Sequence, residues 1–142
     1  MIKSILTIVG ILAASWVLAT DDTQSSKLTV IIKNLKTQEG KVGITLFDSD
    51  EKFLEQGLVE KTVKSSATGF VEIVIENLPH GTYAISAMHD QDGDGELDTA
   101  VFGIPTEPYG FSNDARGKFG PPSFDDSKFI INGDKTIEIN VK

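Results

Sequence analysis

Cysteine is absent from this chain of 142 residues, and tryptophan occurs only once. Without cysteine, no disulfide can form, no thiolate can act as a nucleophile, and no lipid can be attached through an N-terminal cysteine. Small secreted domains of eukaryotes usually need disulfides, so an exported domain without them is more typical of bacteria. Basic residues are also few: 13 Lys and Arg stand against 21 Asp and Glu, a net charge of −8. This excess of negative charge argues against nucleic acid and anionic lipid as partners.

Long hydrophobic runs are absent too, except near the N-terminus. There, Lys3 precedes an almost unbroken apolar stretch over 5–18. A short basic start followed by such a stretch is typical of a secretory signal peptide, and the stretch is shorter than a usual transmembrane helix. We therefore predict a signal peptide over 1–19, cleaved after Ala19 or Thr20. An uncleaved N-terminal anchor is the alternative.

The rest of the chain has the length of one domain. We expect a disordered, polar lead-in over 20–26, followed by a single domain over 27–142 that is long enough to bury a core without disulfides. After cleavage of the leader, we expect a monomer in the periplasm or outside the cell, with no membrane segment.

Apolar residues alternate with a period of two in six segments, which predicts half-buried β-strands. The segments are 28–32, 42–46, 71–75, 83–87, 129–131 and 137–141. Between the last two lies Asn132-Gly133-Asp134, a strong hairpin signal because Asn and Gly tolerate positive φ. One short helix is expected from Asp48 to Gly57, with Asp48 and Glu51 as a capping box and with Phe53 and Leu54 under the sheet edge.

These elements predict an all-β fold: a seven-stranded Greek-key β-sandwich with one short helix and a long ordered loop. No internal repeat is evident, and no further helical pattern is found.

The acidic loop, which we define as residues 89–98, is the most informative stretch. It reads His-Asp-Gln-Asp-Gly-Asp-Gly-Glu-Leu-Asp and contains no Lys or Arg. Two unit charges about 8 Å apart repel by about 2 kcal/mol at an effective dielectric constant near 20. Such a loop is suited to a cation, and Ca²⁺ prefers oxygen ligands from carboxylates and carbonyls.

The spacing of the acidic loop matches that of an EF-hand, in which positions 1, 3, 5, 7 and 9 supply the ligands and position 6 is glycine. Counted from position 1, the corresponding residues are Asp90, Asp92, Asp94, Gly95, Glu96 and Asp98. Glu96 would bind through its backbone carbonyl and the four aspartates through their side chains. We therefore predict a calcium site. The alternative is a solvated Asp-Gly turn without an ion.

Position 12 departs from the EF-hand pattern. Val101 stands there instead of the usual bidentate Glu. A carboxylate from elsewhere would have to complete the shell, and Glu107 is our first candidate, ahead of Asp125 and Asp126.

A second unusual segment follows, which we call the aromatic excursion (residues 102–124). It holds four of the five prolines and five aromatic residues. So many helix and strand breakers predict neither element, and ordered loops of this length tend to be functional. We expect an ordered excursion packed beside the acidic loop.

Two interpretations of the aromatic excursion compete. In the first, Tyr109 and Phe111 line a groove, and the groups that contact a ligand or partner are Ser112, Asn113 and Arg116. In the second, the excursion is an Ω-loop whose aromatic side chains cap the open end of the sandwich. We favour capping for Phe102, Phe119 and Phe124.

The run Pro79-His80-Gly81-Thr82-Tyr83 resembles the turn that opens a central strand in prealbumin-like or carboxypeptidase-regulatory-like sandwich domains. That resemblance implies a seven-stranded Greek-key sandwich used for display, recognition or stability. Three runs in order (89–98, 103–113 and 120–125) resemble a family of exported bacterial proteins catalogued as domain of unknown function, number 2141. This resemblance implies a secreted or periplasmic single domain with no established activity.

Three functional hypotheses follow. The first is an exported, non-enzymatic binding or structural module that holds one Ca²⁺ and interacts with an unidentified protein or an envelope glycan. The second is a hydrolase of cell-envelope polysaccharides or esters that uses His89 and a nearby carboxylate as its acid–base pair. The third is an adhesive or assembly protein whose exposed aromatic side chains form the contact surface.

Overall fold

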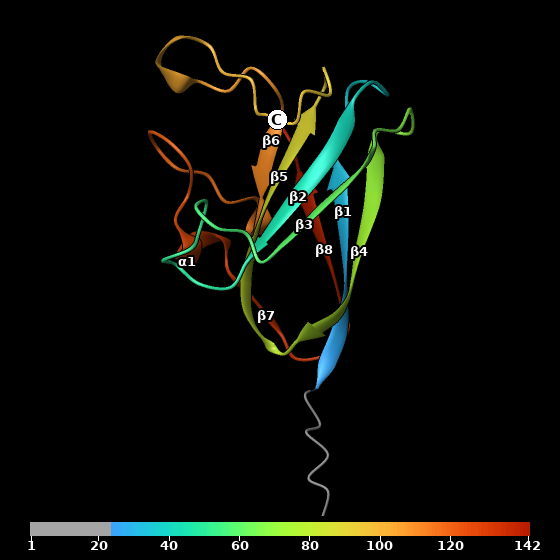
Figure 1. Ribbon diagram of the computed structural model, residues 1–142, viewed down its shortest axis with the longest axis vertical. Coiled ribbons are helices and arrows are strands. Elements are labelled where there is room, and N and C mark those ends of the chain that lie inside the picture. The colour runs from blue at the N-terminus through green and yellow to red at the C-terminus, as the bar shows by residue number, and fades with distance from the viewer. Residues whose placement is uncertain (1–23) are drawn as a thin grey trace, which may run out of the picture.

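The computed structural model describes residues 24–142, which form two packed β-sheets (Figure 1). The first sheet has the order β4-β1-β8. Its strands are β1 (Ser25–Lys33), β4 (Phe70–Pro79) and β8 (Lys135–Asn140). The predicted signal peptide, 1–19, and residues 20–23 of the predicted lead-in lie outside the described residues. β1 begins at Ser25, two residues before the expected start of the domain.

The second sheet has the order β3-β2-β5-β6, and β7 pairs with the first residues of β5. Its strands are β2 (Lys41–Phe47), β3 (Val59–Lys64), β5 (Gly81–Asp90), β6 (Tyr109–Phe111) and β7 (Phe129–Ile131). All pairs in this sheet are antiparallel, whereas β1 and β8 are parallel.

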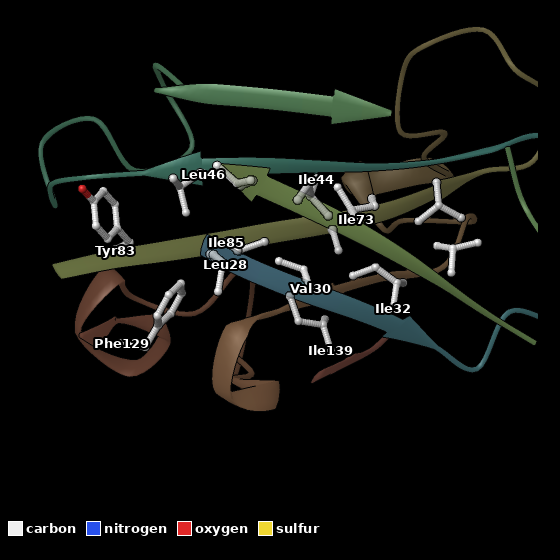
Figure 2. Close-up of a cluster of buried hydrophobic side chains, with 14 of the residues drawn as sticks. Leu28, Val30, Ile32, Ile44, Leu46, Ile73, Tyr83, Ile85, Phe129 and Ile139 are labelled. Atoms are coloured by element: carbon white, nitrogen blue, oxygen red, sulfur yellow. The ribbon is translucent and has the colours of Figure 1, made fainter. Parts of the chain in front are cut away.

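The core lies between the two sheets, where the alternating apolar residues of each strand meet (Figure 2). In β1, Leu28, Val30 and Ile32 are fully buried and are separated by residues that are half-buried or exposed. The same alternation in β2 buries Val42, Ile44 and Leu46. Burial of such side chains contributes about 1.5–3 kcal/mol each, so the period-two pattern largely determines which face of each strand is inside.

An all-β sandwich is therefore confirmed, although it has eight strands where seven were expected. The two strands without a sequence signal are β3, an edge strand with only Val59 and Val63 half-buried, and the three-residue β6 inside the aromatic excursion. The prediction that the excursion contains no strand was thus wrong. Among residues 24–142, no helix has the length and apolar character needed to cross a membrane.

The helix expected from Asp48 to Gly57 is not formed, and this segment is a series of turns. Leu54 adopts a positive φ of 63°, which interrupts a right-handed helix. Phe53 nevertheless packs inward, with its ring centroid 5.2 Å from that of Phe47 and 5.8 Å from that of Phe124. The one α-helix among the described residues is α1 (Phe124–Ser127), a single turn capped by the Ser123 side chain.

The hairpin expected at Asn132-Gly133-Asp134 was also wrong. β7 pairs with β5, whereas β8 pairs with β1, so this turn carries the chain from one sheet to the other. The corner between β4 and β5 does the same at Pro79. There, the Tyr83 hydroxyl donates a hydrogen bond of 2.7 Å to the Pro79 carbonyl, which fastens the corner.

Candidate metal centre

The acidic loop leaves the second sheet directly from the end of β5 (Figure 1). Asp90, the last residue of β5, pairs with Lys41 at the start of β2. Its side chain is only 4% exposed, whereas those of Asp92 and Asp94 are exposed. The loop thus has a buried carboxylate at its base and exposed carboxylates further out.

Asp90 organises the loop through its two carboxylate oxygens. Oδ1 accepts a hydrogen bond from the Gly93 amide (2.9 Å), and Oδ2 accepts one from the Gly95 amide (2.8 Å). Both glycines have positive φ, 74° and 85°, which lets the backbone curl around the carboxylate. Burial alone would raise the pKa of Asp90. Hydrogen bonds with the Gly95 amide, the Asp92 carboxyl and the Gly93 and Asp94 amides outweigh it and lower the pKa.

Asp92 and Asp94 form successive turns of the same kind. The Asp94 amide donates to Asp92 Oδ1 (3.1 Å), and the Glu96 amide donates to Asp94 Oδ1 (2.8 Å). The Asp94 amide by itself lowers the pKa of Asp92. Hydrogen bonding with the carboxyl groups of Asp98 and Asp90, together with desolvation and the charge of Asp94, raises that pKa to about 6. The crowded carboxylates therefore favour a proton on Asp92 when no other cation is near.

Glu107 reaches this cluster from the aromatic excursion. Its carboxylate is 6% exposed and accepts hydrogen bonds from the amides of Gln91 (2.8 Å) and Asp98 (3.0 Å), which lie near the two ends of the loop. The Thr106 amide also donates to the Asp98 carbonyl (2.8 Å). Glu107 thus clamps the ends of the acidic loop together.

The carboxylates fall into two overlapping groups that share Asp92. One is Asp90, Asp92 and Glu107, and the other is Asp92, Asp94 and Asp98; within each group, one oxygen of every residue lies within 4.8 Å of the others. Two ligands of the same Ca²⁺ lie at most about 5 Å apart, because Ca–O distances are about 2.3–2.6 Å. The oxygens therefore converge closely enough to share an ion.

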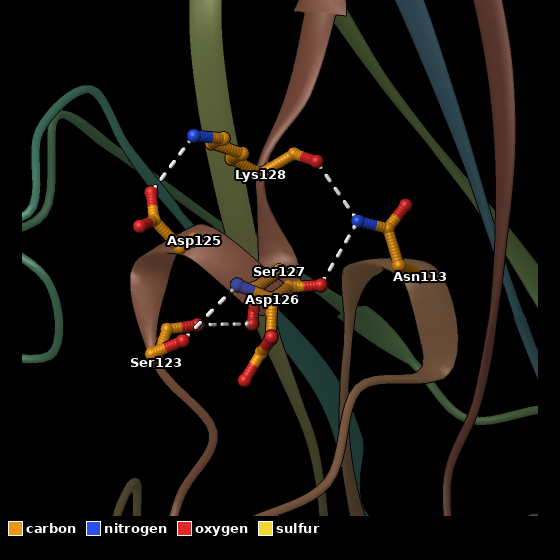
Figure 3. Close-up of polar contacts among 6 residues, drawn as sticks. All are labelled: Asn113, Ser123, Asp125, Asp126, Ser127 and Lys128. Atoms are coloured by element: carbon orange, nitrogen blue, oxygen red, sulfur yellow. Dashed lines mark hydrogen bonds and ion pairs between the residues drawn. The ribbon is translucent and has the colours of Figure 1, made fainter.

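The remaining candidates for the metal shell are placed differently. The Glu96 side chain belongs to neither group, and ligation by its carbonyl stays a prediction. Asp125 and Asp126 lie in α1 and belong to neither group, and Asp125 forms an ion pair of 2.8 Å with Lys128 (Figure 3). None of the ion pairs found among residues 24–142 involves a carboxylate of the acidic loop or Glu107.

His89 is fully buried beneath the loop. Its Nε2 lies 2.8 Å from the Glu39 carbonyl, and its Nδ1 has no hydrogen-bond partner among the described residues. A general base must come within hydrogen-bond reach of its substrate, and this fully buried position does not favour that role for His89. The hydrolase hypothesis stays a prediction.

Tyr109 and Phe111 lie in β6, opposite Met88 and Ser86 of β5, and point to the outer face of the second sheet. Both line a cavity of about 510 Å³ on that face. Phe111 is buried. Sequence reasoning missed the floor of this cavity, because the outward-facing residues of β2, β3 and β5 carry no apolar pattern.

The three polar residues predicted to contact a ligand make internal contacts. The Ser112 hydroxyl accepts from the Ile85 amide (2.9 Å) and donates to the Ser127 carbonyl (2.5 Å). The Asn113 side-chain amide donates to the carbonyls of Asp126 and Lys128 (Figure 3).

Arg116 lies over the Tyr109 ring, 5.4 Å from its centroid, and donates to the carbonyls of Tyr109 and Asn140. Together with the bonds of Ser112 and Asn113, these contacts hold the aromatic excursion against the sandwich.

Of the three aromatics expected to cap the sandwich, only Phe124 is buried. Phe102 and Phe119 are 97% and 103% exposed, so their predicted capping role was wrong. Phe102 stands in a turn with φ of 64°, next to the exposed Val101 and Ile104. The segments that carry Phe102 and Phe119 project instead of folding back onto the core.

Comparison with known proteins gives one match. No curated protein and no solved structure matches the chain, so the likeness to prealbumin-like domains stays a prediction. A family model described as "Uncharacterized protein conserved in bacteria (DUF2141)" matches residues 30–140, which include every strand from β2 to β8, the acidic loop and the aromatic excursion. The chain therefore belongs to this bacterial family.

Proposed function

We propose that this domain is an exported, non-enzymatic binding or structural module in which one Ca²⁺ fastens the acidic loop to the aromatic excursion. Side chains of Asp90, Asp92, Asp94, Asp98 and Glu107 would supply the ligands, with the Glu96 carbonyl. The proposal depends on one observation, which concerns the carboxylates of Asp90 and Glu107. Both carboxylates are nearly buried, and neither forms an ion pair with a Lys or Arg among residues 24–142.

Buried carboxylates without a positive partner are costly, and the penalty in proteins is several kcal/mol per ion before compensation. Amide hydrogen bonds offset part of this cost for both residues. Each carboxylate oxygen still has a lone pair free after accepting one hydrogen bond. A divalent cation between the two groups would use these lone pairs and remove the repulsion that otherwise favours a proton on Asp92.

Ca²⁺ fits these ligands better than Mg²⁺. The oxygens come from a glycine-containing loop and a separate segment, and Ca²⁺ accepts irregular shells of six to eight oxygens. Mg²⁺ demands a nearly ideal octahedron and keeps several waters. Modules outside the cell bind Ca²⁺ with dissociation constants of about 10⁻⁴–10⁻³ M, a range that suits a loop lacking the EF-hand glutamate.

The test is thermal unfolding of the full chain in excess Ca²⁺, in excess Mg²⁺ and in chelator. Ca²⁺ at a hundred times its dissociation constant should add about 2.7 kcal/mol to the free energy of unfolding. Asp92→Asn should remove most of that gain, whereas Asp50→Asn, an exposed acidic residue outside the cluster, should keep it. An unchanged melting temperature of the wild-type chain between Ca²⁺ and chelator would overturn the proposal.

The proposed export has its own test. Intact mass spectrometry of the protein recovered from the periplasm or medium of an expressing bacterium should give the mass of a chain that begins at Thr20 or Asp21. Recovery of the full-length chain in the membrane fraction would instead support the uncleaved anchor.

A second candidate function is adhesion or assembly, and the exposed aromatics favour it. The two most exposed aromatic side chains among the described residues are those of Phe102 and Phe119, whereas Phe111 is buried. Isolated cell envelopes offer both protein and glycan partners. Phe102→Ser should therefore reduce the fraction of the protein that cosediments with envelopes. An unchanged sedimented fraction would exclude Phe102 from the contact surface.

A further inference from the structure

The cavity on the outer face of the second sheet has a floor made by four strands. Its floor residues include Gly43 of β2, Thr62 of β3, Met88 of β5 and Tyr109 of β6. Gly43 pairs with Thr62 on one side and with Met88 on the other, so it lies in the middle of that floor (Figure 1 shows the strand order). Leu97 of the acidic loop and Pro105 and Pro121 of the aromatic excursion form the walls.

Gly43 has no structural reason to be glycine. Its φ is not in the positive region, and an added Cβ would meet only ordinary contacts, 3.6 Å from Thr62 Oγ1 and 3.8 Å from the Lys61 carbonyl. By contrast, a Cβ at Gly57 would collide with the Thr45 side chain. Glycine inside a strand weakens the strand and often marks a bulge, a tight bend or a place where a ligand or another backbone approaches closely. The pairing of β2 continues through Gly43 on both sides without a bulge. At Gly43 the missing side chain leaves space in the cavity itself.

The size and lining of the cavity suit a small molecule. Ligand pockets measure about 300–1,000 Å³ and combine an apolar lining with a few polar groups, and this cavity of about 510 Å³ has both. Met88, Leu97, Tyr109 and the prolines supply apolar surface, while Thr62 supplies a hydroxyl.

Charge indicates what kind of molecule would enter. Glu60 is the one charged residue that lines the cavity, and it forms no ion pair among the described residues. In the smaller hollow beside it, Lys41 and Asp90 carry opposite charges. The net charge of −8 further attracts cations and repels anions.

We propose that this cavity, floored by Gly43 and bordered by Glu60, binds a small cationic amine with an apolar ring. The ring would lie over Gly43 between Met88 and Thr62, and the ammonium group would pair with Glu60. Leu97 of the acidic loop borders this site, but none of the proposed calcium ligands lines it.

Three probes that share an indole ring and differ in charge test the proposal: tryptamine (cationic), indole (neutral) and indole-3-acetate (anionic). Met1 and Met88 are the two methionines of the chain, so the labelled methyl group of Met88 reports directly on the cavity by NMR. In chelator, tryptamine should shift the Met88 signal saturably, and its affinity should exceed that of indole about two- to fivefold, the range of an exposed ion pair. Indole-3-acetate should bind more weakly than indole.

Two variants and one control variant make the test specific. Gly43→Val should fold at least as well as wild type, because Val favours strands, and should abolish the saturable shift. Gly133→Val is the matched control, since Gly133 also has open space around it and no positive φ, but does not line the cavity. Glu60→Gln should reduce tryptamine binding to the level of indole and leave indole binding unchanged.

The proposal is overturned if tryptamine gives no saturable shift, if Gly43→Val binds it as wild type does, or if indole-3-acetate binds as tightly as tryptamine. Should Gly43→Val not fold, Thr62→Tyr fills the same space from an exposed position and is judged by the same criterion.

Discussion

The carboxylates of Asp90 and Glu107 lie together at the base of the acidic loop, and both are almost completely buried. The chain brings them together by a short return. A bridge between Thr99 and Pro105 and a hydrogen bond from the Thr106 amide to the Asp98 carbonyl turn the backbone back on itself. Glu107 thereby reaches the cluster where an EF-hand would use the residue at position 12.

Replacing Glu107 by glutamine should therefore have two effects. In the absence of metal, the Gln side-chain NH₂ would face one of the amides that Glu107 now accepts from, and an unsatisfied buried donor costs about 1–3 kcal/mol. In the presence of Ca²⁺, most of the metal-induced stabilisation should also disappear. Chemical denaturation of wild type and Glu107→Gln, each with and without Ca²⁺, measures both effects.

The matched control for that experiment is Glu72→Gln, the same change at an exposed position of β4. It should alter the free energy of unfolding by less than about 0.5 kcal/mol and keep the response to Ca²⁺. If Glu107→Gln retains the full response, Glu107 is not a ligand.

The stabilisation by Ca²⁺ should increase between pH 5 and pH 7. The pKa of Asp92 in the metal-free protein is raised to about 6. A raised folded-state pKa means that bound protons stabilise the fold at low pH and that this stabilisation is lost as the pH rises through 6. At pH 5, Ca²⁺ must compete with the proton on Asp92. At pH 7, the Asp92 carboxyl group is ionised, and Ca²⁺ instead removes the repulsion between the neighbouring carboxylates. Melting temperatures with and without Ca²⁺ at both pH values provide the test, and an equal shift at each would show that Asp92 does not couple metal to proton.

Ser112 should behave as a structural residue. Its buried hydroxyl joins the Ile85 amide to the Ser127 carbonyl, so Ser112→Ala should leave a buried donor unsatisfied and destabilise the fold by about 1–3 kcal/mol. Ser49→Ala is the matched control, because the buried Ser49 hydroxyl has no partner among the described residues. Its removal should be neutral or slightly stabilising. Urea denaturation measures the free energy of unfolding of both variants. Equal changes in the two variants would show that the hydrogen bonds of Ser112 contribute little to stability.

The sequence predicted best where one face of a strand is buried. The stripes of β1, β2 and β4 follow from alternation alone, because a shift of one residue would turn every apolar side chain into solvent. β3 was not predicted because an edge strand buries few side chains. β6 was not predicted because it lies among the prolines and glycines of the aromatic excursion, which argue against a strand. The helix expected after Asp48 failed because local capping and composition do not reveal a positive φ at Leu54.

The candidate metal centre was predictable in part. The aspartates of the acidic loop have a recognisable spacing, and Glu107 could be nominated because the loop lacked a final ligand. The burial of Asp90 and Glu107 depends on how β5 and the excursion pack, which no local pattern encodes. The cavity over Gly43 was invisible for the same reason, since strand pairing alone brings Gly43, Thr62 and Met88 side by side.

The corner at Pro79 gives a final prediction, in which pH changes the result. Tyr83→Phe removes the hydrogen bond to the Pro79 carbonyl and should cost about 0.5–1.5 kcal/mol at pH 7. Burial, and then the charge of Asp48, raise the pKa of Tyr83 above 10.0. Its contribution is therefore complete below pH 10 and is lost as the pH rises through the folded-state pKa, so wild type and variant should converge in strongly alkaline solution. Tyr109→Phe is the control, because no hydrogen bond from the Tyr109 hydroxyl is found among residues 24–142. A stability difference that stays constant up to high pH would mean that Tyr83 does not ionise in the folded protein before it unfolds.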